Sequence, residues 1–434
     1  MMTMATEREK ERIRTVARLL HQACRPMRIL SAIAWAPEVK ETFLAKGGRE
    51  LPQPSYPMFD PGPTVEAVRE ARRYIVPVTT IDTWLDRQAQ AIELGARMLA
   101  AVGTNAFFEY GRQLYGEPTA PLRYIPVTPQ GLAQTVLDTI AQLTHIEIRT
   151  EPSTYHSAES VAERLADAVR IHFGDQAPTI ELVDRLSANA LATSKSIRVR
   201  RGARFTDRDF VQLLHHEAYI HVATSLNGRE QSELPILAAG HPGTTRTQEG
   251  LAVFAELISG TIELDRLRRL ADRVVAIQMA IDGADFIAVY QYFLERTWDP
   301  DQSFESARRV FRGGVVTGGA PFTKDVVYLM GLMQINYFVR ACFAAGRADC
   351  LSLLFCGKLD LFDMPALCEL YAMELCRPPR FLPPWVSDPR YLLGVLTFAT
   401  FANSHDLSPL VAVASKLLDS APLVRMPTPE PPPT

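Results

Sequence analysis

The chain has 434 residues, of which 47% are hydrophobic and 22% charged, so it can bury a substantial core. Its 46 basic and 49 acidic residues leave a net charge of −3, which excludes a global attraction to nucleic acid or to an anionic membrane surface. Any partner must therefore be recognised by a local site.

The N-terminal part of the chain predicts helices. Its first residues carry alternating charges and no apolar core followed by a cleavage site, so we expect a helix over residues 5–24 and no signal peptide. A Pro-rich passage separates this helix from a second, mostly helical stretch over residues 64–113. These segments predict an N-terminal helical region over residues 1–125, followed by a second region over residues 126–420.

The second region opens with elements of both kinds. Helices are expected over residues 130–145 and 158–173. The β-branched runs Ile180–Val183 and Ser196–Val199, with an Ala/Ser-rich separation, then predict two paired strands. The sequence therefore predicts a small sheet just before its most distinctive segment.

That segment holds His216, Glu217 and His221 as H-E-x-x-x-H, followed by Glu249 within Q-E-G-L-A. Two imidazoles and a carboxylate from separate helices can hold Zn²⁺ with one position left open, and a glutamate beside the first histidine can deprotonate the water that fills it. Histidines five residues apart lie roughly 140° apart around a straight α-helix, which is too divergent for one ion. A π-type turn brings residue i+5 back over residue i, so the pattern predicts a local distortion between the two histidines.

The flanking residues predict where the two helices end and begin. Asn227-Gly228 predicts the C-terminus of the first helix, because either residue tolerates the left-handed conformation of a C-cap. Thr245 with Gln248 three positions later fits a capping box, which would place Glu249 in the first turn of the second helix.

These motifs resemble those of the QEGLA-motif proteins, described as flavohaemoglobin expression-modulating, and of the related microtubule-associated tyrosine carboxypeptidases. The resemblance covers about residues 103–383, and its most specific matches are His215-His216-Glu217, His221, Asn227-Gly228 and Gln248-Glu249-Gly250-Leu251-Ala252. It implies that His216, His221 and Glu249 bind Zn²⁺, that Glu217 is the catalytic base, and that the substrate is a peptide C-terminus.

A second cluster, FRGGVVTGGAPFTKDVVYLMGL, has four glycines within residues 312–319 and also resembles the family. Arg312 or Lys324 could receive the C-terminal carboxylate of a substrate, and the phenol of Tyr328 could stabilise an oxyanion. The alternative, which stays open, is a structural turn with Lys324 paired to an acid. Thr323 is expected to cap the helix that follows.

The C-terminal hundred residues predict further helices. Five of the six cysteines lie there without a C-x-x-C pair, so we expect buried free thiols. The longest apolar run, residues 391–402, is too short to cross a bilayer, and residues 421–434 are expected to form a disordered Pro-rich tail. We therefore expect a cytoplasmic protein with neither a membrane nor a nucleic acid as its partner.

Together, these features predict an α+β, mainly helical protein with a zincin-like catalytic core over residues 126–420. We expect a small β-sheet beside the active-site helix, with an edge that binds an extended peptide, since zinc peptidases commonly offer such an edge. The predicted function is a Zn²⁺-dependent metallopeptidase, namely a carboxypeptidase that acts on a peptide or protein C-terminus with Glu217 as base. Two alternatives stay open: a hydrolase of small amino-acid or glutathione-like conjugates, and a non-catalytic zinc-binding regulatory protein.

Overall fold

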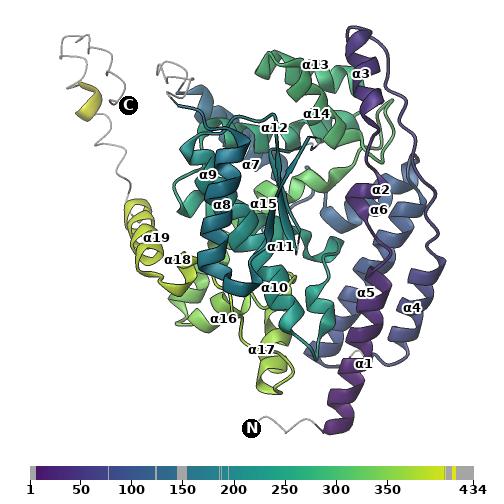
Figure 1. Ribbon diagram of the computed structural model, residues 1–434, viewed down its shortest axis with the longest axis vertical. Helices are drawn as coiled ribbons and strands as arrows, with labels where there is room; N and C mark the ends of the chain where they lie inside the picture. Colours follow the sequence, from purple (N-terminus) through teal and green to yellow (C-terminus); the bar gives the residue numbers. More distant parts are fainter. Residues whose placement is uncertain are drawn as a thin grey trace.

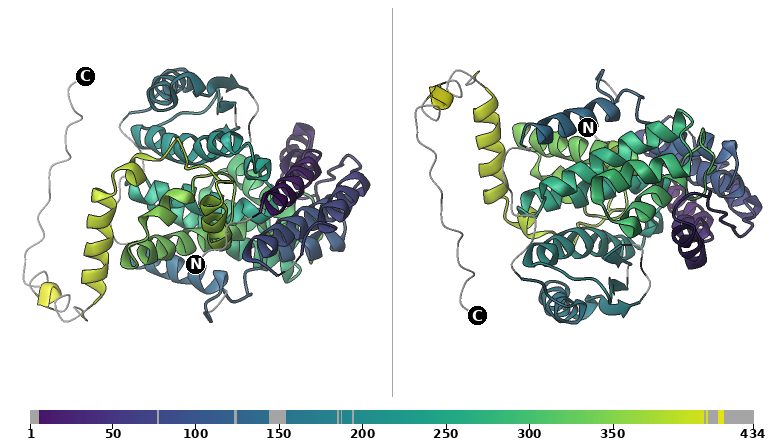
Figure 2. Two further views of the ribbon diagram at one scale, coloured as in Figure 1. Left: turned by 90° about the horizontal axis from the view of Figure 1, so that it is seen from below. Right: turned by 90° about the horizontal axis from the view of Figure 1, so that it is seen from above.

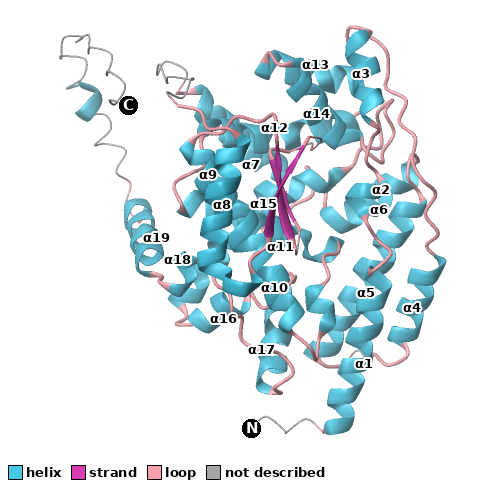
Figure 3. Cartoon of the chain, viewed as in Figure 1, coloured by secondary structure: helices cyan, strands magenta, loops and turns pink. Residues whose placement is uncertain are grey.

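The computed structural model describes residues 6–76, 78–122, 125–143, 154–184, 186, 188–193, 195–404, 406 and 413–416. The protein is mainly helical with one small sheet (Figures 1 and 3), which agrees with the expected α+β class. The predicted tail, residues 421–434, lies outside the described residues. The division of the chain near residue 125 stays a prediction.

The described N-terminal part forms six helices, four of them in the predicted helical stretches and two, over residues 29–32 and 37–45, where no helix is predicted. They are α1 (Glu7–Cys24), α2 (Ile29–Ala32), α3 (Pro37–Ala45), α4 (Gly62–Arg72), α5 (Thr80–Ala100) and α6 (Asn105–Tyr115). The first residue of α1 and that of α5 each follow a threonine whose hydroxyl accepts a backbone N–H of the first turn, as N-caps do. Helices α1, α4 and α5 lie side by side at one side of the molecule (Figure 1).

Two long helices, α11 (Pro242–Ile258) and α15 (Val326–Ala344), cross at the centre of the protein. They meet at Gly250 and Gly331: a Cβ added to Gly250 would lie 2.5 Å from the carbonyl carbon of Gly331. The missing side chains thus let the two backbones touch. Together with the turn before it, α15 has the length and composition of a membrane-crossing helix over residues 323–344. However, 56% of the 18-residue apolar window in this stretch is buried inside the protein, as in a core helix.

The sheet has three strands, β1 (Thr179–Val183), β2 (Ala190–Ala192) and β3 (Ser196–Arg200), in the order β1-β3-β2. Strands β1 and β3 pair in parallel with Thr179 opposite Ser196, which confirms the predicted pairing. Strand β2 runs antiparallel along the other side of β3 and forms an edge of the sheet. The sequence does not predict β2, because its alanines lack the β-branched character of strand residues.

The remaining helices surround this centre. They are α7 (Pro129–Ala141), α8 (Ala158–Phe173), α12 (Leu264–Ile281), α13 (Phe286–Thr297), α14 (Pro300–Phe311), α16 (Ala348–Leu353), α17 (Met364–Ala372), α18 (Pro384–Ser387) and α19 (Arg390–Asn403). Figure 2 shows α8 and the sheet as a layer on one side of the central helices. All six cysteines are free and five of them are buried, as expected.

Candidate active site

The H-E-x-x-x-H motif lies in a rod made of α9 (Asp207–Leu213), a π-helix η2 (Leu214–Val222) and α10 (Ala223–Glu230). The π-helix confirms the distortion that the five-residue spacing predicts. Because residue i+5 lies over residue i in a π-turn, the rings of His216 and His221 come together, with their centroids 5.0 Å apart.

The π-helix is fixed from two sides by apolar side chains. Leu214, Ala218 and Val222 are buried in the cluster that contains the sheet and α8. Ile220 is buried in the central cluster, which contains α11. This packing fixes the rotation of the helix about its axis, and therefore the side to which its histidines point.

The first helix does not end at Asn227-Gly228, so that prediction is wrong: α10 continues through both residues. The buried amide of Asn227 donates to the carbonyls of Phe355 and Phe381 and accepts from the N–H of Phe381. A Cβ added to Gly228 would lie 2.3 Å from the carbonyl oxygen of Leu237. The pair therefore serves close packing of α10 against other chain segments, and not a left-handed turn.

The predicted start of the second helix is also wrong. Helix α11 begins at Pro242 with His241 as its N-cap, and the hydroxyl of Thr245 lies inside the helix, 3.4 Å from the His241 carbonyl. Proline fits the first helical position, because its φ is already helical and it lacks an N–H that would go unpaired. Glu249 therefore lies in the third turn of α11, still on a rigid element.

The structure brings His216, His221 and Glu249 together. One ligand atom from each lies within 4.8 Å of the others, and this is the only such group of His, Cys, Asp or Glu side chains in the described part of the chain. Nε2 of His221 is 4.0 Å from Oε2 of Glu249. Zinc bonds of about 2.0–2.2 Å place tetrahedral ligand atoms roughly 3.4 Å apart, so small side-chain movements would complete the set.

A buried carboxylate orients the first histidine. Oε1 of Glu256 lies 2.7 Å from Nδ1 of His216 and accepts a hydrogen bond of 2.9 Å from Arg266, which also bonds Oε2 at 2.9 Å. This arrangement leaves Nε2 of His216 for a metal ion, as second partners of zinc-binding histidines do. Burial opposes ionisation of Glu256, but Arg266 holds its pKa well below the usual range.

Glu256 is not among the residues predicted from the sequence, although its spacing from Glu249 carries a signal. Glu256 lies seven residues after Glu249, or two helical turns, and so projects from the same face of α11.

The surroundings shift the pKa values of the two histidines in opposite directions. Burial alone would lower the pKa of His216, but the hydrogen bond to Glu256 raises it. Burial lowers the pKa of His221 well below its ordinary value, which favours the neutral form that binds metals.

Glu217 is buried between the π-helix and the edge strand β2. The backbone N–H of Ala192 donates a hydrogen bond of 2.8 Å to its Oε2. Burial raises the pKa of Glu217. A carboxylate with a raised pKa is suited to accept and release a proton near neutral pH.

Lys324 is paired with an acid, and that acid is Glu249. Nζ of Lys324 donates to Oε1 of Glu249 at 2.9 Å and to the hydroxyl of Tyr328 at 3.4 Å. Burial opposes ionisation of both partners, but Glu249 raises the pKa of Lys324 and Lys324 lowers the pKa of Glu249 to about 2. Thr323 does not cap α15: it lies in a 3₁₀ turn, η4 (Thr323–Asp325), and its buried hydroxyl has no hydrogen-bond partner within the described residues.

Arg273 and Arg309 lie 5.7 and 5.9 Å from the ring centroid of Tyr328, and Arg312 also interacts with Tyr328 electrostatically. Asp325 accepts hydrogen bonds of 2.6 and 2.9 Å from Arg309, and its distance to Arg273 is 3.6 Å. Arg312 forms no ion pair with any described residue, and its buried Nε has no partner. Burial lowers the pKa of Arg273 to about 9 and that of Arg312 to about 10. The surroundings of Tyr328 are therefore rich in positive charge that Asp325 alone does not balance.

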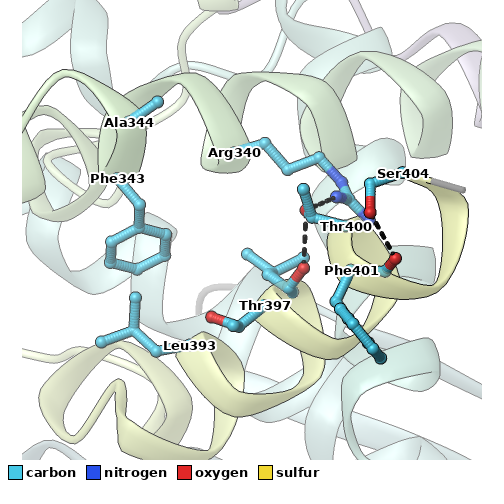
Figure 4. Close-up of a pocket in the computed structure, with 9 residues that line it drawn as sticks. Arg340, Phe343, Ala344, Leu393, Thr397, Thr400, Phe401 and Ser404 are labelled. Atoms are coloured by element: carbon cyan, nitrogen blue, oxygen red, sulfur yellow. Dashed lines mark hydrogen bonds between the residues drawn. The ribbon is translucent and has the colours of Figure 1, made fainter.

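A separate hollow lies between α15 and α19 (Figure 4). Arg340 reaches from α15 to the hydroxyl of Thr400 on α19, and Phe343 faces Leu393 across the gap. None of the predicted site residues lines this hollow, so it is distinct from the candidate active site.

Two imidazoles and a carboxylate that converge beside a buried glutamate define a candidate hydrolase site. Comparison with protein families agrees with this class: the model described as microtubule-associated tyrosine carboxypeptidase matches residues 41–404. The chain therefore belongs to this family, which indicates a hydrolase of the carboxypeptidase type. No curated protein matches the chain, and the finer resemblance to the QEGLA-motif proteins stays a prediction.

Proposed function

We propose that the protein is a Zn²⁺-dependent carboxypeptidase with a zincin-like core, in which His216, His221 and Glu249 hold the ion. The observation that supports the proposal is that these three side chains converge. His216 and His221 come from the π-helix η2, and Glu249 comes from the neighbouring helix α11. The donor set fits zinc, because it offers two imidazoles and one carboxylate, and Glu256 occupies Nδ1 of His216. When bound there, Zn²⁺ would supply a Lewis acid and lower the pKa of water to about 7.

Glu217 is the proposed general base. The N–H of Ala192 holds Oε2 of its carboxylate, which leaves Oε1 to take a proton from water and then to deliver it to the leaving amine. The same contact places the outer edge of β2 beside Glu217. An extended peptide that pairs with this edge would therefore lie along the proposed active site.

A peptide or protein C-terminus is the proposed substrate. Its terminal carboxylate would carry a negative charge to the cations around Tyr328, and an arginine can bind a carboxylate through two parallel hydrogen bonds. Arg312, Lys324 and Tyr328 are the proposed substrate-binding residues. Because Lys324 already holds Glu249, we assign the carboxylate first to Arg312, which has no ion pair among the described residues.

The substitution Glu217→Gln tests this function. The amide has nearly the same shape but cannot take up a proton, so we expect full zinc content, an unchanged fold and a rate about 10²–10⁴ lower. His216→Ala and Glu249→Ala should instead abolish zinc binding. Metal analysis would give the zinc content, and mass spectrometry would follow the release of C-terminal residues from a peptide library with varied C-termini.

Each outcome of this experiment bears on one part of the proposal. Wild-type turnover by Glu217→Gln would place the base elsewhere, and full zinc content in His216→Ala or Glu249→Ala would refute the ligand assignment. Small amides, including glutathione, are assayed beside the peptides. Turnover of these amides alone would favour the small-conjugate hydrolase, and turnover of neither would favour a regulatory protein.

A further inference from the structure

Lys358 is a partly buried lysine that contacts both helices of the candidate metal centre. Its Nζ donates three hydrogen bonds of 3.0 Å each, to the carbonyl oxygen of His221, the hydroxyl of Thr224 and the side-chain oxygen of Gln248. An ammonium group has three donors, so all of them are used. Lys358 forms no salt bridge with any residue that the structure describes, so its place is set by these three acceptors.

The acceptors of Lys358 are close to the metal ligands in the chain. One is the backbone of His221 itself, and Gln248 directly precedes Glu249 in α11. The hydroxyl of Thr224 also donates to the side-chain oxygen of Gln248 at 2.8 Å, so the side chains of Lys358, Thr224 and Gln248 are all hydrogen-bonded to one another. The ammonium group of Lys358 thus links the backbone of His221 to Gln248, the residue directly before Glu249.

These contacts fall where the π-helix changes back to an α-helix, between Val222 and Ala223. At such a junction the i→i+5 and i→i+4 hydrogen-bond patterns do not match, so carbonyl groups accept hydrogen bonds from other donors. The carbonyl of His221 accepts from the hydroxyl of Ser225 at 2.6 Å as well as from Lys358. Lys358 therefore stabilises the turn on which the five-residue spacing depends.

The backbone at Gly357 and Lys358 packs closely against a neighbouring turn, which places the lysine side chain beside the ligand helices. The backbone N–H of Lys358 donates to the carbonyl oxygen of Leu237 at 2.7 Å, in the turn η3 (Pro235–Ala238). A Cβ added to Gly357 would lie 2.4 Å from that same oxygen. Glycine at this position lets the backbone approach η3 closely, and the lysine side chain then extends toward the ligand helices.

We propose that Lys358 is a positioning residue that holds the backbones of His221 and Glu249 in place, so that both side chains can reach one metal ion. The inference rests on the proposed function, because it takes these side chains as ligands. Removing a positive charge near a cation strengthens binding of the cation, whereas loss of positioning weakens it. The sign of the change in metal affinity therefore distinguishes a positioning role from a purely electrostatic one.

Lys358→Met tests the proposal, because it removes the three donors and keeps an unbranched side chain. We expect the Kd for Zn²⁺, measured by competition with a chromophoric chelator, to rise about 10- to 100-fold. The visible spectrum of the Co²⁺-substituted protein should change as well. Asn227→Ala is the matched control, since it breaks buried contacts of α10 without touching a ligand; it should lower stability but keep the wild-type Kd and spectrum.

A folded Lys358→Met protein with unchanged or tighter zinc binding would overturn the proposal, and so would an equal weakening in Asn227→Ala. Circular dichroism reports the fold of each variant. If Lys358→Met does not fold, Gln248→Met takes its place, because it removes one acceptor of Nζ and the link to α11; an unchanged Kd would then count against the proposal. Absence of zinc binding by the wild-type protein would instead refute the proposed function.

Discussion

Arg312 and Lys324 are close in sequence, yet they have different partners. Lys324 holds one oxygen of Glu249 and leaves the other free to face His221. Arg312 is buried without an ion pair among the described residues, and a charge removed from water without a partner is costly. A negatively charged substrate group would supply the missing partner to Arg312 but would have to compete with Glu249 for Lys324.

This difference predicts how Arg312→Ala and Lys324→Ala change kcat/KM for peptides with and without a free C-terminal carboxylate. Arg312→Ala should lower kcat/KM for peptides with a free C-terminal carboxylate roughly ten- to 150-fold, because a charge-assisted hydrogen bond contributes about 1.5–3 kcal/mol. On C-terminally amidated peptides the variant should match the wild type, because amidation already removes the charged partner. Lys324→Ala, the comparison variant, should reduce both rates equally through Glu249. An equal loss on both peptide forms in Arg312→Ala would show that this arginine is structural.

The residues of the candidate metal site could be predicted from the sequence, but the residues that hold them mostly could not. His216, Glu217 and His221 form a local pattern that specifies both residue type and spacing. Lys358 is separated from His221 by 137 residues, and a lysine whose partners are this distant in the sequence is by default expected at the surface. Its role exists only after the chain has folded around α10 and η3.

At the scale of elements, the histidine spacing predicted the π-helix correctly, whereas the residue types that favour helix ends did not predict where two helices end and begin. The π-helix follows from a rigid requirement, since two ligands five residues apart need a widened turn. The predicted helix ends at Asn227-Gly228 and at Thr245 rest on local preferences of about 1 kcal/mol, which tertiary packing overrides. The four side-chain hydrogen bonds of Asn227 outweigh such a preference and keep α10 helical.

The crossing of α11 and α15 predicts a strong effect for a small substitution. A Cβ on Gly331 would lie 2.5 Å from the carbonyl oxygen of Arg246, so Gly331→Ala should push the helices apart and lower the free energy of unfolding by about 1–3 kcal/mol. Gly394→Ala in α19 is the control: among the described residues, no atom beyond its chain neighbours and its own helix backbone lies within 4 Å of the added Cβ, so it should be neutral or stabilising by up to about 1 kcal/mol. Urea unfolding measures both. Equal stability of the two variants would mean that the helices can separate freely.

At the scale of the whole molecule, the candidate metal centre lies at the border of two hydrophobic clusters. The cluster of the sheet and α8 includes one face of η2, whereas the central cluster includes α1, α5, α11 and α15. Two of the proposed ligands come from η2 and the third from α11. This border could not be predicted from the sequence, because the central cluster combines residues from Ile13 to Leu396.

An ion bound by all three ligands would join the two clusters, so its removal should loosen the smaller one. Chelation of Zn²⁺ is expected to lower the Tm of the wild-type protein, because a ligand present at a thousandfold excess over its Kd stabilises the native state by about 4 kcal/mol. Hydrogen exchange should then increase more in β3 and α8 than in α1 and α5, which lie wholly in the central cluster. His216→Ala, which lacks a ligand, should show neither change on chelation. An unchanged Tm, or an increase in exchange that is uniform along the chain, would mean that the ion does not connect the clusters.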